Sequence, residues 1–180
     1  MDICRLTQMD RDFIVQAAIL LIEDFPQSWP TEAEAVGEIE KCLEDEKVAL
    51  VAVADGKAIG FIGAMPQYGK TGWELHPLVV APQWQRQGVG SALINALEQE
   101  VAERGGITLY AGSDDEQGKT SLSDCDLYDH LWERIRDIRN LKSHPYEFYI
   151  KMGYQIVGVF PDVNGCGKPD IWLAKRISQP

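Results

Sequence analysis

An α/β (α+β) fold, with a mixed central sheet flanked by helices, is the fold class that the sequence predicts. Segments with apolar residues at helical spacing alternate with short runs rich in Val, Ile and aromatic residues, which favour strands. The predicted order of elements is α-α-β-β-β-α-β-α-α-β-β. Because the 180 residues contain no internal repeat and no low-complexity linker, we interpret residues 1–180 as a single domain.

The first half of the chain predicts two helices, a hairpin and a further strand. The expected elements are helices at 11–25 and 31–46, two strands within 47–68, and a strand at 72–81. Pro26 ends the first helical pattern. Thr31 stands where a helix N-cap is expected, and Glu34 follows three residues later, which is the signature of a capping box. The dipeptide Asp55-Gly56 between two β runs is a strong signal for a hairpin.

The second half predicts helices and strands around one long connection. The expected elements are a helix at 91–103, a strand at 107–113, a short helix within 144–154, and strands at 155–162 and 170–177. The connection from 114 to 143 is longer than most, and a helical stripe with Ser123 or Asp124 as its cap is predicted within it. The stripe consists of Leu127, Leu131, Ile135 and Ile138.

Composition narrows the classes of function. The formal charge of −11 argues against nucleic-acid binding, which needs a basic face, and is compatible with a cationic substrate. No apolar run is long enough to span a membrane, and the first residues lack the order of a signal peptide. The four cysteines lie far apart and share no metal-ligand spacing with the histidines. We therefore expect a cytoplasmic protein with reduced thiols, no bound metal and no membrane partner.

A glycine-containing turn precedes the helix expected at 91–103. The stretch Gln85-Arg86-Gln87-Gly88-Val89-Gly90-Ser91 stands between a strand and that helix. Glycines let backbone N–H groups turn inward, and a helix N-terminus adds unpaired donors with a partial positive charge. Such a turn suits a phosphate or pyrophosphate, although it matches neither a Walker loop nor a dinucleotide fingerprint. By itself it leaves a plain tight turn equally open.

The strand before this turn carries a carboxylate and an imidazole. In Trp-Glu-Leu-His-Pro-Leu-Val-Val, a period of two predicts that Glu74, His76, Leu78 and Val80 share one face. An amine is protonated at neutral pH and attacks a thioester only after it loses a proton, which a carboxylate can accept. Glu74 is thus a candidate base, and His76 is either a second catalytic group or a histidine with a packing role. Tyr149 is a candidate donor to a leaving thiolate, or a core residue.

The pattern V-V-A-P-x-x-Q-R-x-x-G-x-G resembles motif A of the GCN5-related N-acetyltransferases (GNAT), and the element order agrees with their acyl-CoA N-acyltransferase fold. Over nearly the whole chain, the sequence further resembles the aminoglycoside 6′-N-acetyltransferases of the chromosomal Gram-positive type. The stretches Gly-Trp-Glu-Leu-His-Pro-Leu and His-Pro-Tyr-Glu-Phe-Tyr, together with the long insert from Asp114 to Ser143, carry this resemblance.

The resemblance implies roles for particular residues. Glu74 is implied as base or amine anchor, the Leu78 N–H as donor to the thioester carbonyl, and Tyr149 as acid toward sulfur. The residues implied to bind coenzyme A are Leu78, Val79, Val80, Gln85, Arg86, Gln87, Gly88, Val89, Gly90, Ser91 and Tyr149. Those implied to line the aminoglycoside side are Phe25, Trp29, Tyr68, Glu74, Asp114 and Asp115.

The expected reaction is transfer of acetyl from acetyl-CoA to the 6′-amine of an aminoglycoside by direct attack on the thioester. The resemblance also implies a homodimer and a link to antibiotic resistance. Acetylation of another cationic amine, such as a polyamine or a protein lysine, is the alternative reaction. A coenzyme A-binding regulator without catalysis is a third reading, and the presence of Glu74 and Tyr149 argues against it.

Overall fold

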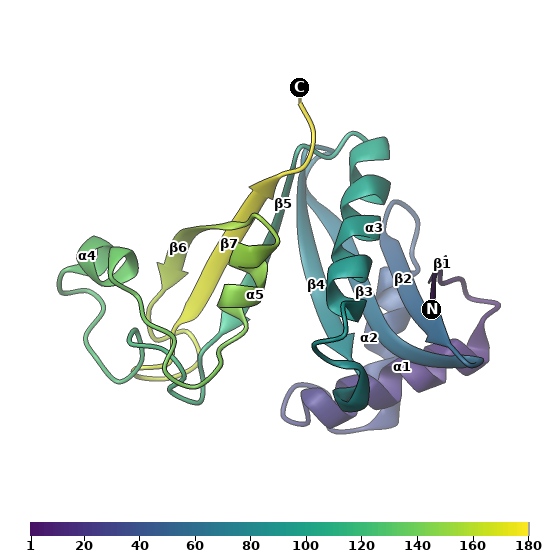
Figure 1. The fold of residues 1–180 in the computed structure, drawn as a ribbon, viewed down its shortest axis with the longest axis horizontal. Coiled ribbons are helices and arrows are strands. Elements are labelled where there is room, and N and C mark those ends of the chain that lie inside the picture. The colour runs from purple at the N-terminus through teal and green to yellow at the C-terminus, as the bar shows by residue number, and fades with distance from the viewer. Residues whose placement is uncertain (180) are drawn as a thin grey trace. The chain divides into compact units, whose positions relative to one another are not determined.

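The computed structural model describes residues 1–179, which group into two compact units (Figure 1). Unit 1 comprises Met1–Leu109 and the last residues from Ile177 onward, and unit 2 comprises Tyr110–Arg176. The sequence predicted a single domain over residues 1–180, and this stays a prediction. Since β5 (Thr108–Asp114) continues from the first unit into the second, the boundary falls inside a strand.

Unit 1 contains an antiparallel sheet whose strands neighbour one another in chain order. The strands are β1 (Asp2–Arg5), β2 (Val48–Ala54), β3 (Lys57–Tyr68) and β4 (Gly72–Val80). Asp55 and Gly56 both have positive φ, at 51° and 71°, which confirms the predicted tight hairpin between β2 and β3. The sequence analysis missed β1, because a four-residue, largely exposed edge strand has too little alternation to predict it.

Helices cover both faces of this sheet. They are α1 (Arg11–Asp24), α2 (Glu32–Cys42) and α3 (Val89–Glu103). On one face, a Cβ at Gly63 would meet Cys42 of α2; on the other, a Cβ at Gly60 would meet Leu93 of α3. The capping box predicted for α2 is present, with Thr31 and Glu34 satisfying each other's backbone N–H. The cluster of buried apolar residues between the sheet and the α1/α2 pair includes Ile14, Ile39, Phe61 and Val79.

Unit 2 contains three strands and two short helices. Its sheet neighbours are β5, β7 (Asp170–Arg176) and β6 (Gln155–Phe160) in that order, with β6 and β7 antiparallel. The helices are α4 (Leu131–Arg136) and α5 (Tyr146–Lys151). The short helix predicted within 144–154 corresponds to α5, and Gly153 follows it with φ 89°, as a helix-terminating glycine does.

The helical stripe predicted in the insert is wrong in extent. Only six residues, Leu131–Arg136, are helical, the helix follows His130 in a left-handed conformation, and none of its residues is buried. Leu127 is buried, but it lies in a turn before the helix. The insert therefore gains its order from hydrogen bonds to a buried carboxylate, described below, more than from an amphipathic helix.

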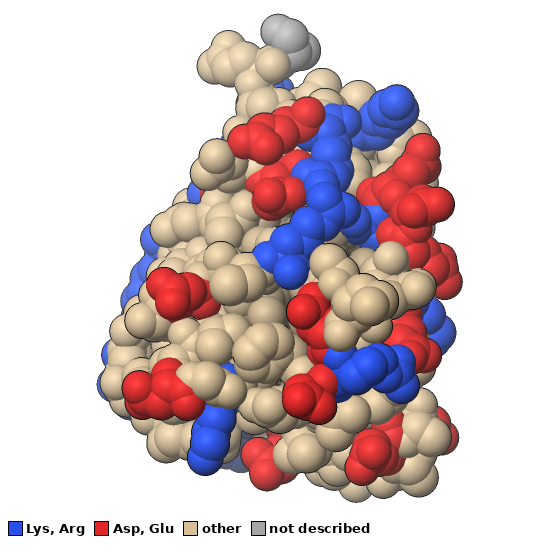
Figure 2. Space-filling view, turned by 90° about the vertical axis from the view of Figure 1, so that its right-hand side faces the viewer, with Lys and Arg blue, Asp and Glu red and all other residues tan. Residues whose placement is uncertain are grey.

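The formal charge of −11 comes from 28 acidic and 17 basic residues. On the face drawn in Figure 2, acidic side chains stand interspersed with Lys and Arg. Within residues 1–179, the structure contains no helix long and apolar enough to cross a membrane.

Candidate active site

The strand that carries the candidate catalytic residues contains a β-bulge. Ile62 of β3 pairs with Leu78, but Ala64 pairs with Leu75, so Gly63 alone stands opposite two residues of β4, His76 and Pro77. Gly63 is required at this point, because a Cβ there would lie 2.7 Å from the carbonyl oxygen of His76 and 2.7 Å from the Cys42 sulfur. The bulge thus depends on a close approach that glycine alone permits.

This bulge changes which side chains share a face. Paired residues of neighbouring strands lie on the same face, and here Glu74 pairs with Met65 while Val79 pairs with Phe61. Met65 and Phe61, four residues apart on β3, both pack in the core beneath α1 and α2. The sequence prediction that Glu74 and His76 share a face with Leu78 and Val80 is therefore wrong. Glu74 faces the α1/α2 side, and Leu78 and Val80 face the α3 side, because the extra residue reverses the alternation.

Because the bulge places Glu74 on the α1/α2 face, this residue lies on the same side of the sheet as other residues predicted to line the aminoglycoside site. The rings of Phe25 and Trp29 meet edge to face at 5.6 Å, and Trp29 lies 5.8 Å from the His76 ring. Phe25 and Trp29 are half-buried, and the His76 side chain is 45% exposed. Unit 1 thus brings the two predicted aromatic residues together with His76 next to Glu74.

Glu74 has a hydrogen-bond partner that the sequence analysis did not identify. The Gln67 amide donates to one carboxylate oxygen of Glu74 over 2.8 Å, which orients the carboxylate and leaves its other oxygen for a further partner. Tyr68, at the end of β3, is 72% exposed, and its ring lies against Gly72, where an added Cβ would stand 3.0 Å from the nearest ring atom. The Tyr68 ring is therefore accessible at the edge of the hairpin that carries Gln67.

The predicted cofactor turn presents backbone rather than side chains. After the short 3-10 turn at Pro82–Trp84, Arg86 has φ 61° and Gly88 has φ 89°. Gly88 precedes α3 without any side-chain cap, so the first N–H groups of that helix keep their donor capacity. Among the described residues other than Gly88 and its two chain neighbours, no atom lies within 4 Å of the point where a Cβ at Gly88 would stand. The turn therefore has the open space and the free donors that a pyrophosphate needs.

The side chains of two glutamines in this turn donate hydrogen bonds to nearby backbone carbonyls. The Gln85 amide donates to the carbonyl of Val80 over 3.0 Å, and the Gln87 amide donates to the carbonyl of Gln83 over 2.7 Å. The first bond ties the turn to the end of β4, and the second ties it to the 3-10 turn at Pro82–Trp84. Gln85 and Gln87 consequently hold the shape of the turn in this structure, while α3 begins at Val89, two residues before the predicted start.

In unit 2, Asp115 is a structural centre of the insert. The residue is 1% exposed, and its carboxylate accepts hydrogen bonds from the backbone N–H of Lys119 and Thr120 and from the Ser123 hydroxyl. Burial alone would raise the pKa of this carboxyl, but the hydrogen bonds outweigh burial and lower the pKa. Since its oxygens are occupied, Asp115 organises the loop, in contrast to the contact with substrate that the sequence analysis predicted.

Asp114 remains exposed next to this loop. The Asn164 amide donates to its carboxylate, and a ring nitrogen of buried His144 lies 3.0 Å from its backbone carbonyl. Burial is the main cause that lowers the pKa of His144, which favours the neutral ring inside the unit. Of the two predicted aspartates, Asp114 is the one whose carboxylate reaches the surface.

Tyr149 lies on α5, packed between aromatic rings. Its ring centroid is 5.5 Å from that of Phe148 and 5.6 Å from that of Tyr154. Burial raises the pKa of Tyr149 to about 12, so the hydroxyl carries its proton at neutral pH. A proton donor needs this protonation state, although the residue is only 8% exposed.

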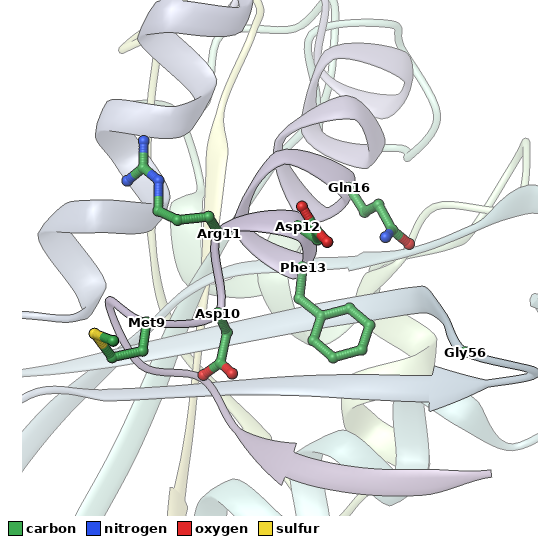
Figure 3. A pocket seen from close by; sticks show the side chains of 7 residues that line it. All are labelled: Met9, Asp10, Arg11, Asp12, Phe13, Gln16 and Gly56. Carbon is green, nitrogen blue, oxygen red and sulfur yellow. The ribbon is translucent and has the colours of Figure 1, made fainter.

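A surface hollow of about 380 Å³ lies elsewhere in unit 1 (Figure 3). Residues Met9 to Phe13 at the start of α1 line it, together with Gln16 and Gly56. The Gln16 side chain accepts a hydrogen bond from the backbone of Ala58, so part of this lining serves the β2–β3 hairpin. The hollow shares no residue with the predicted site.

Comparison with known families identifies the group to which the chain belongs. The model of the acetyltransferase (GNAT) family matches residues 14–122, which include β4, the turn and α3. The chain belongs to the GNAT family. This confirms the fold that the sequence predicted and an acetyl-CoA-dependent N-acetyltransferase as the class of enzyme.

Solved structures extend the similarity to the whole GNAT chain. An aminoglycoside 6′-N-acetyltransferase complexed with coenzyme A is 46% identical, with a TM-score of 0.96 over 100% of this chain and 99% of that one. The aminoglycoside 6′-N-acetyltransferase from Enterococcus faecium is 46% identical, with a TM-score of 0.94 and the same coverage. An aminoglycoside 6′-acetyltransferase type Ii is 40% identical, with a TM-score of 0.79 and again the same coverage. A search of curated proteins gave no match.

Sequence reasoning missed two side chains that contact the candidate site. Gln67 lies at a second register shift, between Pro66 and Tyr68 of β3, and its hydrogen bond to Glu74 is visible only in the folded structure. Glu38 is a buried carboxylate near His76. The sequence could have predicted the burial of Glu38, because this residue falls in the apolar stripe formed by Ala35, Ile39 and Cys42.

Proposed function

We propose that this GNAT enzyme is an aminoglycoside 6′-N-acetyltransferase. The observation that carries the proposal is the 40–46% identity to aminoglycoside 6′-acetyltransferases over 100% of this chain. The GNAT family model ends at residue 122, whereas this similarity includes the rest of the insert and α5. The similarity therefore extends beyond the elements that GNAT enzymes need for acetyl-CoA.

The turn from Gln85 to Ser91 holds the pyrophosphate of acetyl-CoA. Its support is the uncapped start of α3 and the open space beside Gly88, where backbone N–H groups can meet phosphate oxygens. Leu78, Val79 and Val80 pair with the pantetheine arm in the manner of an added strand. The co-substrate supplies the acetyl thioester, and the Leu78 N–H polarises its carbonyl as an oxyanion-type donor.

Glu74 binds the 6′-ammonium and accepts its proton, directly or through water. The hydrogen bond from Gln67 supports this role, because it fixes one carboxylate oxygen and leaves the other for the amine. Tyr149 donates a proton to the sulfur that leaves. Its pKa of about 12 supports a hydroxyl that is protonated when that step begins.

Aromatic and acidic side chains receive the remainder of the aminoglycoside. Phe25 and Trp29 offer ring faces to the sugar, and Asp114 and Tyr68 add an exposed carboxylate and an exposed hydroxyl. An aminoglycoside carries several ammonium groups, so exposed carboxylates and aromatic ring faces are each complementary to it. Asp115 acts through the shape of the loop.

The test is an acetyl-transfer assay with kanamycin or tobramycin, with spermidine and a basic peptide as alternative acceptors. We expect kcat/KM for the aminoglycoside to exceed that for the other amines, and equal values for spermidine would contradict the proposal.

Glu74→Gln keeps the shape of the side chain but cannot take a proton, so turnover with aminoglycoside should fall ~10²-fold while acetyl-CoA affinity changes little. If Glu74 only anchors the amine, KM should rise instead.

We further propose that the enzyme is a cytoplasmic homodimer that confers antibiotic resistance. Large exposed apolar side chains in unit 2 support pairing, with Tyr128 at 75% and Trp132 at 69% exposure. Sedimentation equilibrium measures the mass in solution, and the mass of one chain, 20.1 kDa, at micromolar concentration would contradict the dimer. Resistance is measured as growth of a susceptible bacterium that expresses the gene.

A further inference from the structure

Helix α2 carries a carboxylate in its buried stripe. The buried residues of this helix are Ala35, Glu38, Ile39 and Cys42, so Glu38 occupies a position that would ordinarily hold an apolar side chain. Glu38 is 8% exposed, while its neighbour Glu40 on the same helix is half-exposed and pairs with Arg11. A buried carboxylate costs free energy unless charged or hydrogen-bonding groups compensate it.

Two cationic or titratable groups face the Glu38 carboxylate. The Lys41 ammonium lies 3.0 Å from Oε2 at the surface end, and the His76 Nε2 lies 3.7 Å from Oε1. The hydrogen bond from Lys41 to Glu38 raises the pKa of that lysine, as expected beside an ionised carboxylate. Lys41 balances the negative charge of Glu38 from the solvent side, through Oε2. Stability therefore does not explain why Oε1 is directed at His76.

Helix α2 holds His76 at two points, one turn apart. Besides the contact with Glu38, the Cys42 thiol donates to the carbonyl of His76 over 3.7 Å, at the bulge where Gly63 makes its close approach. Burial raises the pKa of the Cys42 thiol to about 12, so it remains a neutral donor. Trp29 lies against the imidazole ring, which nevertheless keeps an exposed side.

The geometry favours one tautomer of His76. Because Nε2 is the ring atom nearest the carboxylate, the field of Glu38 favours the proton on Nε2 and leaves the lone pair on Nδ1. The separation of 3.7 Å exceeds an ordinary hydrogen bond, so the contact is electrostatic in this structure. Glu74, two residues earlier on β4, is a further charged group on this face.

We propose that Glu38 is a positioning residue of the acetyl-acceptor site, which acts through His76. It fixes the orientation and tautomer of the imidazole at the bulge, so that Nδ1 accepts a hydrogen bond from an ammonium or hydroxyl group of the aminoglycoside beside Glu74. This inference rests on the proposed function for its substrate. Its structural part, the control of the His76 tautomer by Glu38, is independent of that function.

The decisive variant is Glu38→Leu, since leucine suits the apolar stripe of α2. Replacing a buried charge by a well-packed apolar group is often neutral or stabilising, so the melting temperature should stay equal or rise. We expect kcat/KM for the aminoglycoside to fall about tenfold, while the dissociation constant for acetyl-CoA stays unchanged. The matched control is Glu40→Leu on the same helix, which should leave kcat/KM as in the parent. Should Glu38→Leu fail to fold, Glu38→Gln, which keeps the shape, permits the same comparison.

A double-mutant cycle separates positioning from a merely structural effect. In a His76→Asn background, Glu38→Leu should lower kcat/KM less than about twofold further, because its effect passes through the imidazole. The same tenfold loss in both backgrounds would overturn the proposal, as would parental kcat/KM in Glu38→Leu alone.

A spectroscopic readout is independent of activity. The ¹⁵N shifts of the neutral His76 ring, assigned by comparison with His76→Asn, should show the Nε2–H tautomer in the parent and a mixture in Glu38→Leu. An unchanged tautomer in Glu38→Leu would overturn the proposal. If the parent acetylates no aminoglycoside but the tautomer changes as expected, the proposed function fails while the control of His76 by Glu38 stands.

Discussion

Two connections of this GNAT enzyme, the turn from Gln85 to Ser91 and the loop from Asp115 to Ser123, differ in how they obtain their shape. The turn uses backbone conformation, with positive φ at Arg86 and Gly88, and leaves its N–H groups available. In the loop, backbone N–H groups turn inward to one buried carboxylate, that of Asp115. The first arrangement is open to an anion from outside, and the second has an anion of its own.

This difference shows how the same donors serve binding or stability. Backbone N–H groups that converge on a point form an anion site wherever they are left unpaired. In the insert, Asp115 fills that position itself, so its carboxylate is unavailable to a cationic substrate. In the predicted cofactor turn, the space where a Cβ of Gly88 would stand has no atom within 4 Å from any described residue beyond its chain neighbours. The comparison predicts that mutations in the turn affect affinity, and that mutations in the loop affect stability.

The largest expected effect is on the turn. Gly88→Val should lower acetyl-CoA affinity about a hundredfold, because the side chain fills the space that the phosphate needs. Gly105→Val is the matched control, since Gly105 has φ 87° and, chain neighbours aside, no described residue comes within 4 Å of its missing Cβ. Both variants should lose similar stability from backbone strain. Titration calorimetry measures the affinity, and equal losses of affinity in the two variants would contradict the cofactor turn.

The next effect is on the loop. Asp115→Asn places an amide where Lys119, Thr120 and Ser123 donate, and should lower the free energy of unfolding by about 1–3 kcal/mol. The pKa of Asp115 is lowered in the folded state, so its contribution is present above the ordinary value of 3.8 and is lost as the pH falls below it. The difference between parent and variant, measured by urea unfolding, should therefore be constant near neutral pH and shrink in acid. A difference that grows in acid would contradict this assignment.

The smallest effect is expected at the helix of the insert. Leu131→Asp should cost less than about 1 kcal/mol, because Leu131 is half-exposed on a helix without buried residues. Leu127→Ala should cost more, about 2–3 kcal/mol, because Leu127 is 2% exposed. Thermal melts compare the two variants, and a larger loss in Leu131→Asp would restore the amphipathic helix that the sequence predicted.

The same contrast explains which parts of the fold could be predicted. The hairpin at Asp55-Gly56, the capping box from Thr31 to Glu34 and the uncapped turn before α3 depend on residues close together in the chain. The local sequence was therefore sufficient to predict these three features. The prediction of a helical stripe in the insert was wrong, because residues 127–138 have helical spacing but belong to a loop that Asp115 organises. Asp115 lies outside that stretch of sequence.

By itself, the sequence determined the family, and it predicted the cofactor turn and Glu74 as the candidate acceptor of the amine proton. These features rest on local motifs, in which conformation follows from a few neighbouring residues. Only the tertiary structure decided which face of β4 each side chain occupies, because the bulge exists through the pairing of Gly63 with two residues of another strand. Tertiary packing likewise buried Glu38 beside His76 and enclosed Asp115 in its loop. Burial and strand register arise from contacts between distant segments, and a pattern read along one segment does not contain them.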